Sequence, residues 1–224
     1  MTRVSEDRKI WRYLDFTKFV YLLKKEALIF TRVDKLEDQF EGSYSRPTID
    51  DRQKEYTFES GLSPETLSEV FEKFRAYTFV NCWHINEYES AALWDLYTKG
   101  AEGIAILSTD KKLRDALPKN VLLDHVTYID YDKDLMRYDN PLYTFFYKRK
   151  SYEHEHELRA AFLCLPREGG GYHTSPPDIN FTFDLNEKLP FSAYPIPVDL
   201  DSVIDEMRVH PLAEDWFKEV VESG

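Results

Sequence analysis

The chain has 224 residues and a mass of 26.6 kDa, so we expect one domain spanning residues 1–224. It carries 41 Asp and Glu against 29 Lys and Arg, and this net charge of −12 disfavours sequence-independent binding along a polyphosphate. Its 15% of aromatic residues argues against disorder. Two cysteines cannot build a disulfide framework, and no segment approaches the roughly 18 apolar residues of a membrane span. We therefore expect a cytoplasmic protein without membrane association.

The first half of the sequence predicts strands alternating with helices. Runs rich in aromatic and β-branched residues predict strands over residues 9–14, 28–32, 77–83 and 103–108. Apolar residues at helical spacing predict helices over residues 16–27, 65–75, 90–99 and 111–117. Asp15 or Thr17 can cap the first helix, and an acidic, aromatic loop is expected over residues 33–47.

The second half is less regular. It predicts a strand over residues 122–131, a helical or irregular segment over 141–146, a flexible loop over 168–177, extended structure over 178–197, and helices over 203–209 and 215–222. Asp199 or Asp201 can cap the first of these helices. Strands and helices mix without a regular βαβ rhythm, so the sequence predicts an α+β fold.

The stretch Tyr147–Leu163, YKRKSYEHEHELRAAFL, joins alternating charges to an apolar run. In a strand, whose side chains repeat with period two, Glu153, Glu155, Glu157 and Arg159 would share one face. A helix capped by Ser151 and a solvent-exposed strand lead-in are the alternatives. The more specific hypothesis is a pocket in which one glutamate acts on a substrate and Arg159 holds its neighbours in place.

Histidines and carboxylates gather twice, at 153–156 and at 84–89, and could suggest a metal site. No spacing marks a third ligand, and the HEXXH motif is absent. No metal-ligating residue is therefore assigned, and a metal-dependent hydrolase or nuclease is kept only as a minor alternative.

Several blocks in fixed order resemble a bacterial family known only as a domain of unknown function, DUF2971. They are WRY, TRVDKLEDQFEGS, NCWHINEYESAALWDLY, GIAI, YIDY and FFYKRKSYEHEHELR, and the resemblance covers about residues 10–220. This family implies no established activity. Its members are expected to continue with another strand-like segment where this chain reads VVESG.

The order Arg12-Tyr13, helix, short strand and Arg32 is also similar to the start of the ADP-ribosyltransferase toxins that modify DNA. That resemblance implies a bent, mostly antiparallel, split sheet flanked by helices, with nicotinamide adenine dinucleotide (NAD) in its cleft. Carried over by position, the late catalytic glutamate would be Glu157 or Glu155. The implied cofactor-binding residues are Arg12, Tyr13, Arg32, Trp83, Tyr97, Lys148 and Arg159.

Two functions follow as hypotheses. The first is an ADP-ribosyltransferase-like toxin or phage-defence effector that uses the dinucleotide and modifies a nucleic acid or protein acceptor. The second is a non-catalytic binding or regulatory module that uses an acidic and aromatic pocket. The acidic surface is also compatible with a basic partner, such as an antitoxin or a regulator.

Overall fold

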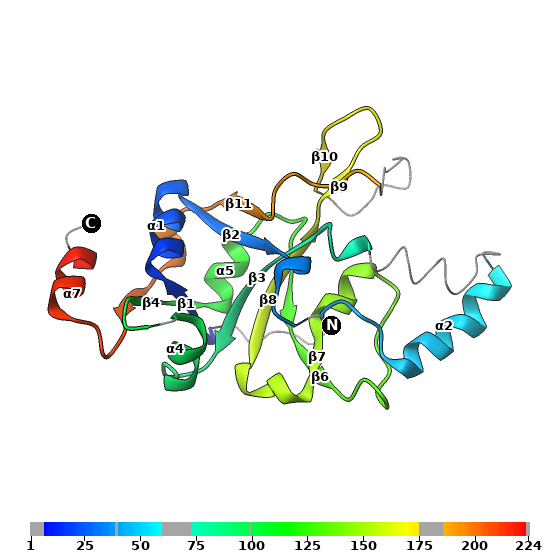
Figure 1. The fold of residues 1–224 in the computed structure, drawn as a ribbon, viewed down its shortest axis with the longest axis horizontal. Helices are drawn as coiled ribbons and strands as arrows, with labels where there is room; N and C mark the ends of the chain where they lie inside the picture. The colour runs from blue at the N-terminus through cyan, green and yellow to red at the C-terminus, as the bar shows by residue number, and fades with distance from the viewer. Residues whose placement is uncertain (1–6, 39, 60–72, 99, 175–185, 223–224) are drawn as a thin grey trace.

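The computed structural model describes residues 7–38, 40–59, 73–98, 100–174 and 186–222 (Figure 1). Its centre is an eight-stranded sheet in which every pair of neighbours is antiparallel. The strands are β1 (Lys9–Asp15), β2 (Ala27–Arg32), β3 (Thr78–Ile85), β4 (Gly103–Thr109), β5 (Leu122–His125), β8 (Glu157–Leu163), β11 (Ala193–Pro197) and β12 (Glu206–Val209). Mixed with helices in one fold, this sheet confirms the α+β class and the mostly antiparallel pairing.

The sheet divides along one edge of β3. β8 pairs with β3 from Thr78 to His84 and so occupies one whole edge. On the other edge, β2 pairs near Val80 and β1 pairs near His84, and the two strands diverge between these points. We call the gap between β1 and β2, along Asn81–Trp83 of β3, the fork. β11 extends the sheet beyond β2, whereas β4 and β12 extend it beyond β1.

Helices cover both faces of the β1–β4 half. α1 (Phe16–Lys25) and α4 (Ala91–Thr98) lie on opposite sides of β1 and β4 (Figure 1). α1 begins where Asp15 accepts a hydrogen bond from the Lys18 backbone N–H at 2.8 Å, which confirms Asp15 as its cap. The other helices are α2 (Arg46–Glu59), α5 (Asp110–Ala116), α6 (Leu200–Val203) and α7 (Asp215–Glu222). No helix among the described residues is long and apolar enough to cross a membrane.

Smaller elements complete the fold. There are two two-stranded sheets, formed by β6 (Thr127–Ile129) with β7 (Tyr147–Arg149) and by β9 (Leu165–Pro166) with β10 (Tyr172–His173). The 3-10 helices are η1 (Val33–Lys35), η2 (Pro141–Phe146) and η3 (Lys150–Glu155).

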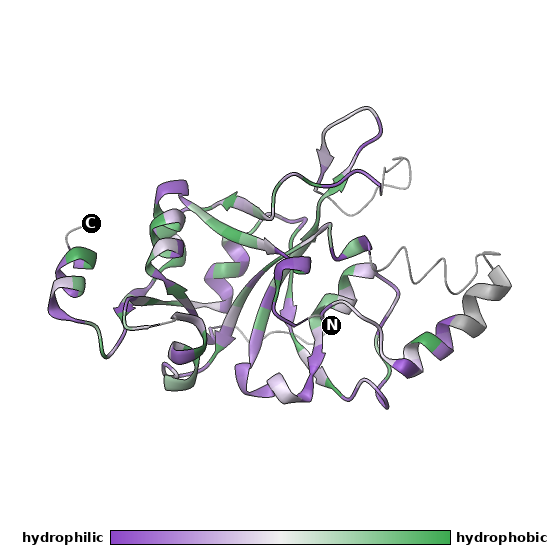
Figure 2. Cartoon of the chain, in the orientation of Figure 1, coloured by the Kyte–Doolittle hydropathy of each residue, from purple (hydrophilic) through white to green (hydrophobic). Residues whose placement is uncertain are grey.

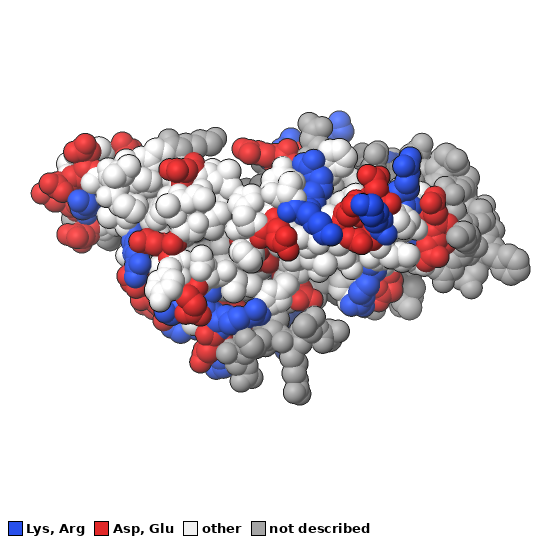
Figure 3. All heavy atoms as spheres, turned by 90° about the horizontal axis from the view of Figure 1, so that it is seen from below, with Lys and Arg blue, Asp and Glu red and all other residues white. Residues whose placement is uncertain are grey.

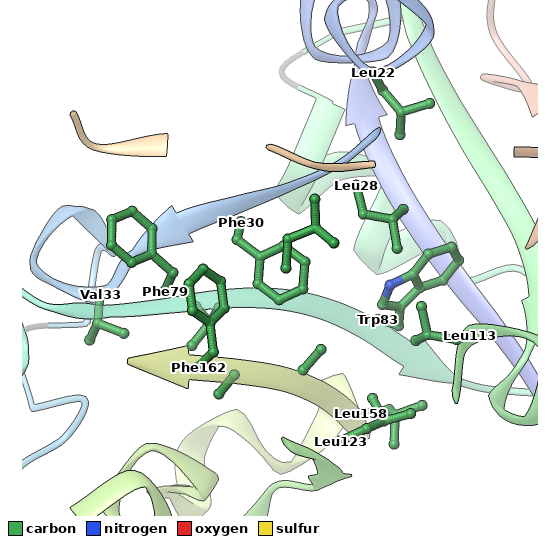
Figure 4. Close-up of a cluster of buried hydrophobic side chains, with 14 of the residues drawn as sticks. Leu22, Leu28, Phe30, Val33, Phe79, Trp83, Leu113, Leu123, Leu158 and Phe162 are labelled. Carbon is green, nitrogen blue, oxygen red and sulfur yellow. The ribbon is translucent and has the colours of Figure 1, made fainter. Parts of the chain in front are cut away.

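The main core lies on the face of the sheet that carries Phe79 and Trp83 of β3. Phe162 of β8 stacks on Phe79 with ring centroids 5.6 Å apart, and Phe30 of β2 meets Phe162 edge to face at 5.4 Å (Figure 4). Leu22 of α1 and Leu113 of α5 close this core from above the sheet. Burying each such side chain contributes about 1.5–3 kcal/mol, so this core fixes the sheet from which the site is built.

The structure decides between the alternatives that the sequence left open for the charged stretch. Residues 150–155 form the 3-10 helix η3, and only Glu157 and Arg159 of the alternating charges lie on a strand. Figure 2 shows β8 hydrophilic at its start and hydrophobic towards its end. A shared face for Glu153 and Glu155 with Glu157 is therefore wrong, because the chain turns at His156 before the strand begins.

Three further predictions need correction. The helix expected over 203–209 is the short α6 followed by strand β12, because β4 offers an edge to which residues 206–209 pair. The strand expected over 122–131 is broken into β5 and β6, and strand β10 lies inside the loop expected over 168–177 and pairs with β9 before it. Helix α2 occupies a segment for which no element was predicted. Most of the helix predicted over 65–75 lies outside the described residues.

Candidate functional site

The fork leaves one strand carbonyl for side chains to satisfy. Ile29 of β2 lies where β1 and β2 have separated, and its carbonyl oxygen accepts from Arg12 Nη2 at 3.1 Å and from Asn81 Nδ2 at 2.8 Å. Asn81 Oδ1 in turn accepts from Trp83 Nε1 at 2.7 Å. Arg12 of β1 therefore bridges the two diverging strands, and Asn81 links β3 to β2, which explains why polar residues stand at these positions.

The charge of Arg12 has no acidic partner. Among the described residues no carboxylate forms an ion pair with it, and its buried Nη1 has no hydrogen-bond partner. The guanidinium lies 5.9 Å from the centroid of the Trp83 ring. Burial lowers the pKa of Arg12 to about 10, since a cation is costly to remove from water. The fork thus holds a cation that nothing in the described structure neutralises.

The opposite face of β3 carries Cys82 and His84, and the ring of Tyr97 on α4 lies beside them. The His84 and Tyr97 ring centroids are 4.9 Å apart. His84 donates its Nδ1–H to the Glu155 carbonyl at 2.8 Å, and burial lowers its pKa to about 4, so it is neutral at pH 7. Burial, reinforced by nearby carboxylates, raises the pKa of Tyr97. Cys82 and Tyr97 are only partly buried.

A buried ionic cluster adjoins Cys82. We define it as Glu41, Lys148, Glu155, Glu157 and Arg159, none of them more than 6% exposed. Arg159 donates Nε to Glu157 Oε1 at 2.6 Å and Nη2 to Glu157 Oε2 at 3.0 Å. Both of its terminal nitrogens also bind the Glu41 carboxylate, and Nη1 reaches the Phe145 carbonyl at 2.7 Å. Every nitrogen of this guanidinium is therefore used.

Lys148 closes the ionic cluster from the other side. Its Nζ lies 2.6 Å from Glu155 Oε2 and 3.5 Å from a carboxylate oxygen of both Glu157 and Glu41. Cys82 lies opposite Arg159 in the pairing of β3 with β8, and burial, together with the charge of Glu157, raises the pKa of its thiol. Cys82 therefore adjoins the ionic cluster, while the other edge of its strand faces the fork. Cys82 is thus the residue through which the two features meet.

Two backbone conformations place these carboxylates. His156 has a left-handed backbone with φ of 44°, and this turn between η3 and β8 sends both Glu155 and Glu157 towards Lys148. Gly42 has φ of 79°, and a Cβ there would lie 2.2 Å from the Phe145 ring. Only glycine lets the backbone at residue 42 approach this closely, which brings the neighbouring Glu41 to Arg159.

Protonation within the ionic cluster is uneven. Burial alone would raise the pKa of Glu157, but the charges of Arg159 and Lys148 outweigh it and hold that pKa at about 2. Burial raises the pKa of Glu155, which the single ion pair to Lys148 offsets only in part. With three carboxylates against two cations, Glu155 is the member best able to take a proton.

The predicted site residues fall into four groups. Glu155, Glu157, Lys148 and Arg159 come together in the ionic cluster, with Tyr97 beside it, and Arg12 and Trp83 meet at the fork. Tyr13 packs edge to face against Trp94 at 5.1 Å, and its hydroxyl accepts from the Ser90 backbone N–H. Arg32 stands apart: it pairs with Asp34 at 2.7 Å and donates to two backbone carbonyls, at Leu189 and Phe191.

Sequence reasoning did not include four residues of this region in the site. Glu41 lies more than 100 positions from Arg159, and only the glycine that follows it could have marked a close approach. Asn81, Cys82 and His84 all lie on β3. The available signal was that these polar residues interrupt an apolar strand, whose alternate side chains point to opposite faces of the sheet.

The histidines proposed for a metal do not assemble. His154 and His156 are exposed, whereas His84 is buried with its Nδ1 on a backbone carbonyl. Within the described ranges, no three His, Cys, Asp or Glu side chains are arranged to hold a metal ion. The minor alternative of a metal-dependent hydrolase gains no support from these side chains.

The fold and the site together define an α+β protein whose antiparallel sheet divides around an arginine that has no acidic partner in the described part of the chain. Comparison of the chain with family models, with curated proteins and with solved structures found no match. The resemblance to the bacterial family and the ADP-ribosyltransferase-like character of the sheet accordingly stay predictions.

Proposed function

We propose that the protein binds an anionic dinucleotide at the fork, with NAD as the specific candidate, and transfers its ADP-ribose part to a nucleic acid or protein acceptor. The observation that carries this proposal is Arg12. Its guanidinium is fixed on the Ile29 carbonyl, has a buried Nη1 without a partner among the described residues, and has no carboxylate partner. A pyrophosphate would supply the missing anion through charge-assisted hydrogen bonds.

The residues on the opposite face of β3, across the fork from Arg12, suit the rest of such a ligand. NAD supplies a ribose–nicotinamide bond whose cleavage develops positive charge on the sugar, which a fixed carboxylate stabilises. Glu157 is ionised at neutral pH and is held rigidly by Arg159. Glu155, whose pKa is raised, would take the proton that an acceptor hydroxyl or amine loses. The partly exposed Tyr97 ring offers a surface for stacking.

One observation favours the second candidate, a binding module without chemistry. The carboxylates of Glu155 and Glu157 are 3% and 2% exposed and already bound by cations. A substrate would reach them only past Cys82 and Tyr97. If the ionic cluster serves stability alone, Arg12 would still bind the dinucleotide, and nothing would be transferred.

The test measures binding and chemistry on the same samples. NAD affinity is followed by calorimetry, and nicotinamide release is followed with labelled NAD, with and without nucleic acid and protein acceptors. The variants are Arg12→Met, Glu157→Gln and Glu155→Gln, and the exposed Arg137→Met is the matched loss of one arginine. Thermal melting of each variant separates lost function from lost folding.

We expect Arg12→Met to weaken NAD binding about 10- to 100-fold, the effect of losing one charge-assisted contact. Arg137→Met should bind like the wild type. Release that disappears in folded Glu157→Gln supports transfer, whereas binding without release supports the module. Equal affinity in wild type and Arg12→Met, or no binding at all, would refute the proposal.

A further inference from the structure

A recess of about 730 Å³ lies far from the fork, where the end of α1 meets the connection from β11 through α6 to β12. Its apolar lining residues are Leu23, Val198, Leu200, Ile204 and Met207. Leu23 and Met207 are 38% and 46% exposed, so large apolar side chains remain open to solvent at its mouth. A contiguous apolar surface of this kind marks a place where another molecule binds.

Carboxylates surround this apolar lining. They belong to Glu26, Asp199, Asp201, Asp205 and Glu206. Lys112 pairs with Asp205, and Arg208 pairs with Glu206, so two of the five are neutralised. In the described structure, no cation forms an ion pair with the other three, although Lys24 and Lys25 precede Glu26 on α1. The recess therefore favours a ligand that is apolar and positively charged.

Strand β12 borders the recess and ends the sheet. His210 donates its backbone N–H to the Gly103 carbonyl at 2.9 Å. Because alternate residues of an antiparallel strand point to the same side, Arg208 and Glu206 also face β4, and the backbone groups of Met207 and Val209 turn outward. Within the described residues nothing bonds to these outward groups, so the strand edge can accept another strand.

We propose that this recess and the edge of β12 bind an extended peptide segment of a partner protein in which Lys or Arg alternates with Val or Leu. The peptide backbone would pair with Met207 and Val209, its apolar side chains would cover Leu23 and Ile204, and its cations would reach the unpaired carboxylates. A second copy of this chain would bring like charges to the same place and is the less complementary occupant. The proposal is independent of the fork and of any activity there.

The test uses two fluorescent hexapeptides with blocked ends and identical composition, KVRLKV and KRKVLV. Both carry the same charge, but only the first places its apolar side chains on one face of a strand. Anisotropy titrations at 0.15 M salt compare wild type with Glu26→Gln/Asp201→Asn. The matched control is Glu37→Gln/Asp95→Asn, two exposed carboxylates outside the recess to which the described residues offer no ion pair. Met207→Thr tests the apolar part while keeping a residue that favours strands.

We expect KVRLKV to bind at least tenfold more tightly than KRKVLV, and the recess double variant and Met207→Thr each to lose about tenfold, a difference of 1.4 kcal/mol. The control pair should change less than twofold. Thermal melts confirm that the variants are folded. Equal binding of the two peptides, equal losses in both double variants, or no binding of KVRLKV up to 1 mM would overturn the proposal. A concentration-dependent dimer that Met207→Thr abolishes would instead assign the edge to a second copy.

Discussion

A buried guanidinium has a full set of partners in the ionic cluster but an incomplete set at the fork. In the cluster, Arg159 binds two carboxylates and a carbonyl, and all its nitrogens have partners. At the fork, Arg12 binds one carbonyl, and no carboxylate among the described residues pairs with it. A completed network fixes structure, whereas a cation without a counter-charge is available to a ligand. Arg159 therefore serves to stabilise the fold, whereas the cation of Arg12 is available to a ligand.

The charged surface follows a third pattern. On the face shown in Figure 3, acidic side chains gather at the end that carries α7, and acidic and basic side chains mix over the other half. Exposed ion pairs such as Arg208–Glu206 are screened by water and contribute little to the free energy of unfolding. The comparison between Arg159 and Arg12 is thus best tested against such a surface pair.

The largest effect is expected at Arg159. Arg159→Met leaves the carboxylates of Glu41 and Glu157 buried without their main partner, and should lower the free energy of unfolding by about 3–5 kcal/mol. Urea denaturation at pH 7 measures this loss. The exposed Arg137→Met should leave the midpoint unchanged within error, and a similarly small change in Arg159→Met would contradict the assigned role of the ionic cluster.

The next effect concerns pH. His84 has a folded pKa of about 4 against an ordinary value of 6.5, so its contribution to stability is complete above pH 6.5 and is lost as pH falls towards 4. When His84 is fully protonated, the free energy of unfolding is lower by about 3 kcal/mol, at 1.36 kcal/mol per pKa unit. Urea midpoints between pH 7 and pH 4.5 should show it.

The variant His84→Gln isolates this contribution. Burial also lowers the pKa of His125, which adds to the loss in the same window, whereas Glu155 acts with the opposite sign because its pKa is raised. Stability of His84→Gln should therefore fall less with decreasing pH than that of wild type, and the exposed His154→Gln should match wild type. Parallel pH profiles for wild type and His84→Gln would show that His84 is not the titrating group.

A smaller effect is expected at the fork. Arg12→Met removes one hydrogen bond to the Ile29 carbonyl, which Asn81 still satisfies, and removes a charge without a counter-ion. The free energy of unfolding should change by less than about 1.5 kcal/mol. The same urea titration measures it. If Arg12→Met lowered the free energy of unfolding as much as Arg159→Met, Arg12 would be a structural residue and the two arginines would have the same role.

The smallest effect is expected on the surface. Arg208→Met breaks an exposed pair with Glu206 and a cation–π contact with the Trp11 ring at 5.0 Å, and should cost less than about 1 kcal/mol. Raising the salt to 1 M should shrink the difference between wild type and variant further. A cost that survives high salt would indicate packing of the arginine stem on Trp11.

Local patterns in the sequence predicted much of the fold. The strand over 9–14, the helix behind Asp15 and the strand over 77–83 correspond to β1, α1 and β3, because periodic burial leaves a direct mark on residue order. The prediction was wrong at β12, since residues 206–209 pair as a strand only because β4 leaves an edge open beside them. Over 150–155 the sequence left strand and helix open, and the structure has the 3-10 helix η3 before the strand.

The sequence by itself determined the α+β class, the acidic surface and the presence of Glu155, Glu157, Lys148 and Arg159 in one charged stretch. Only the tertiary structure decided which charged side chains have ion-pair or hydrogen-bond partners. Glu41 reaches Arg159 across more than 100 residues of chain, and Arg32 is drawn to Asp34 and two carbonyls instead of joining the site. The reason is physical: ion pairs depend on distance and burial in space, and neither is encoded in the spacing of residues along the chain.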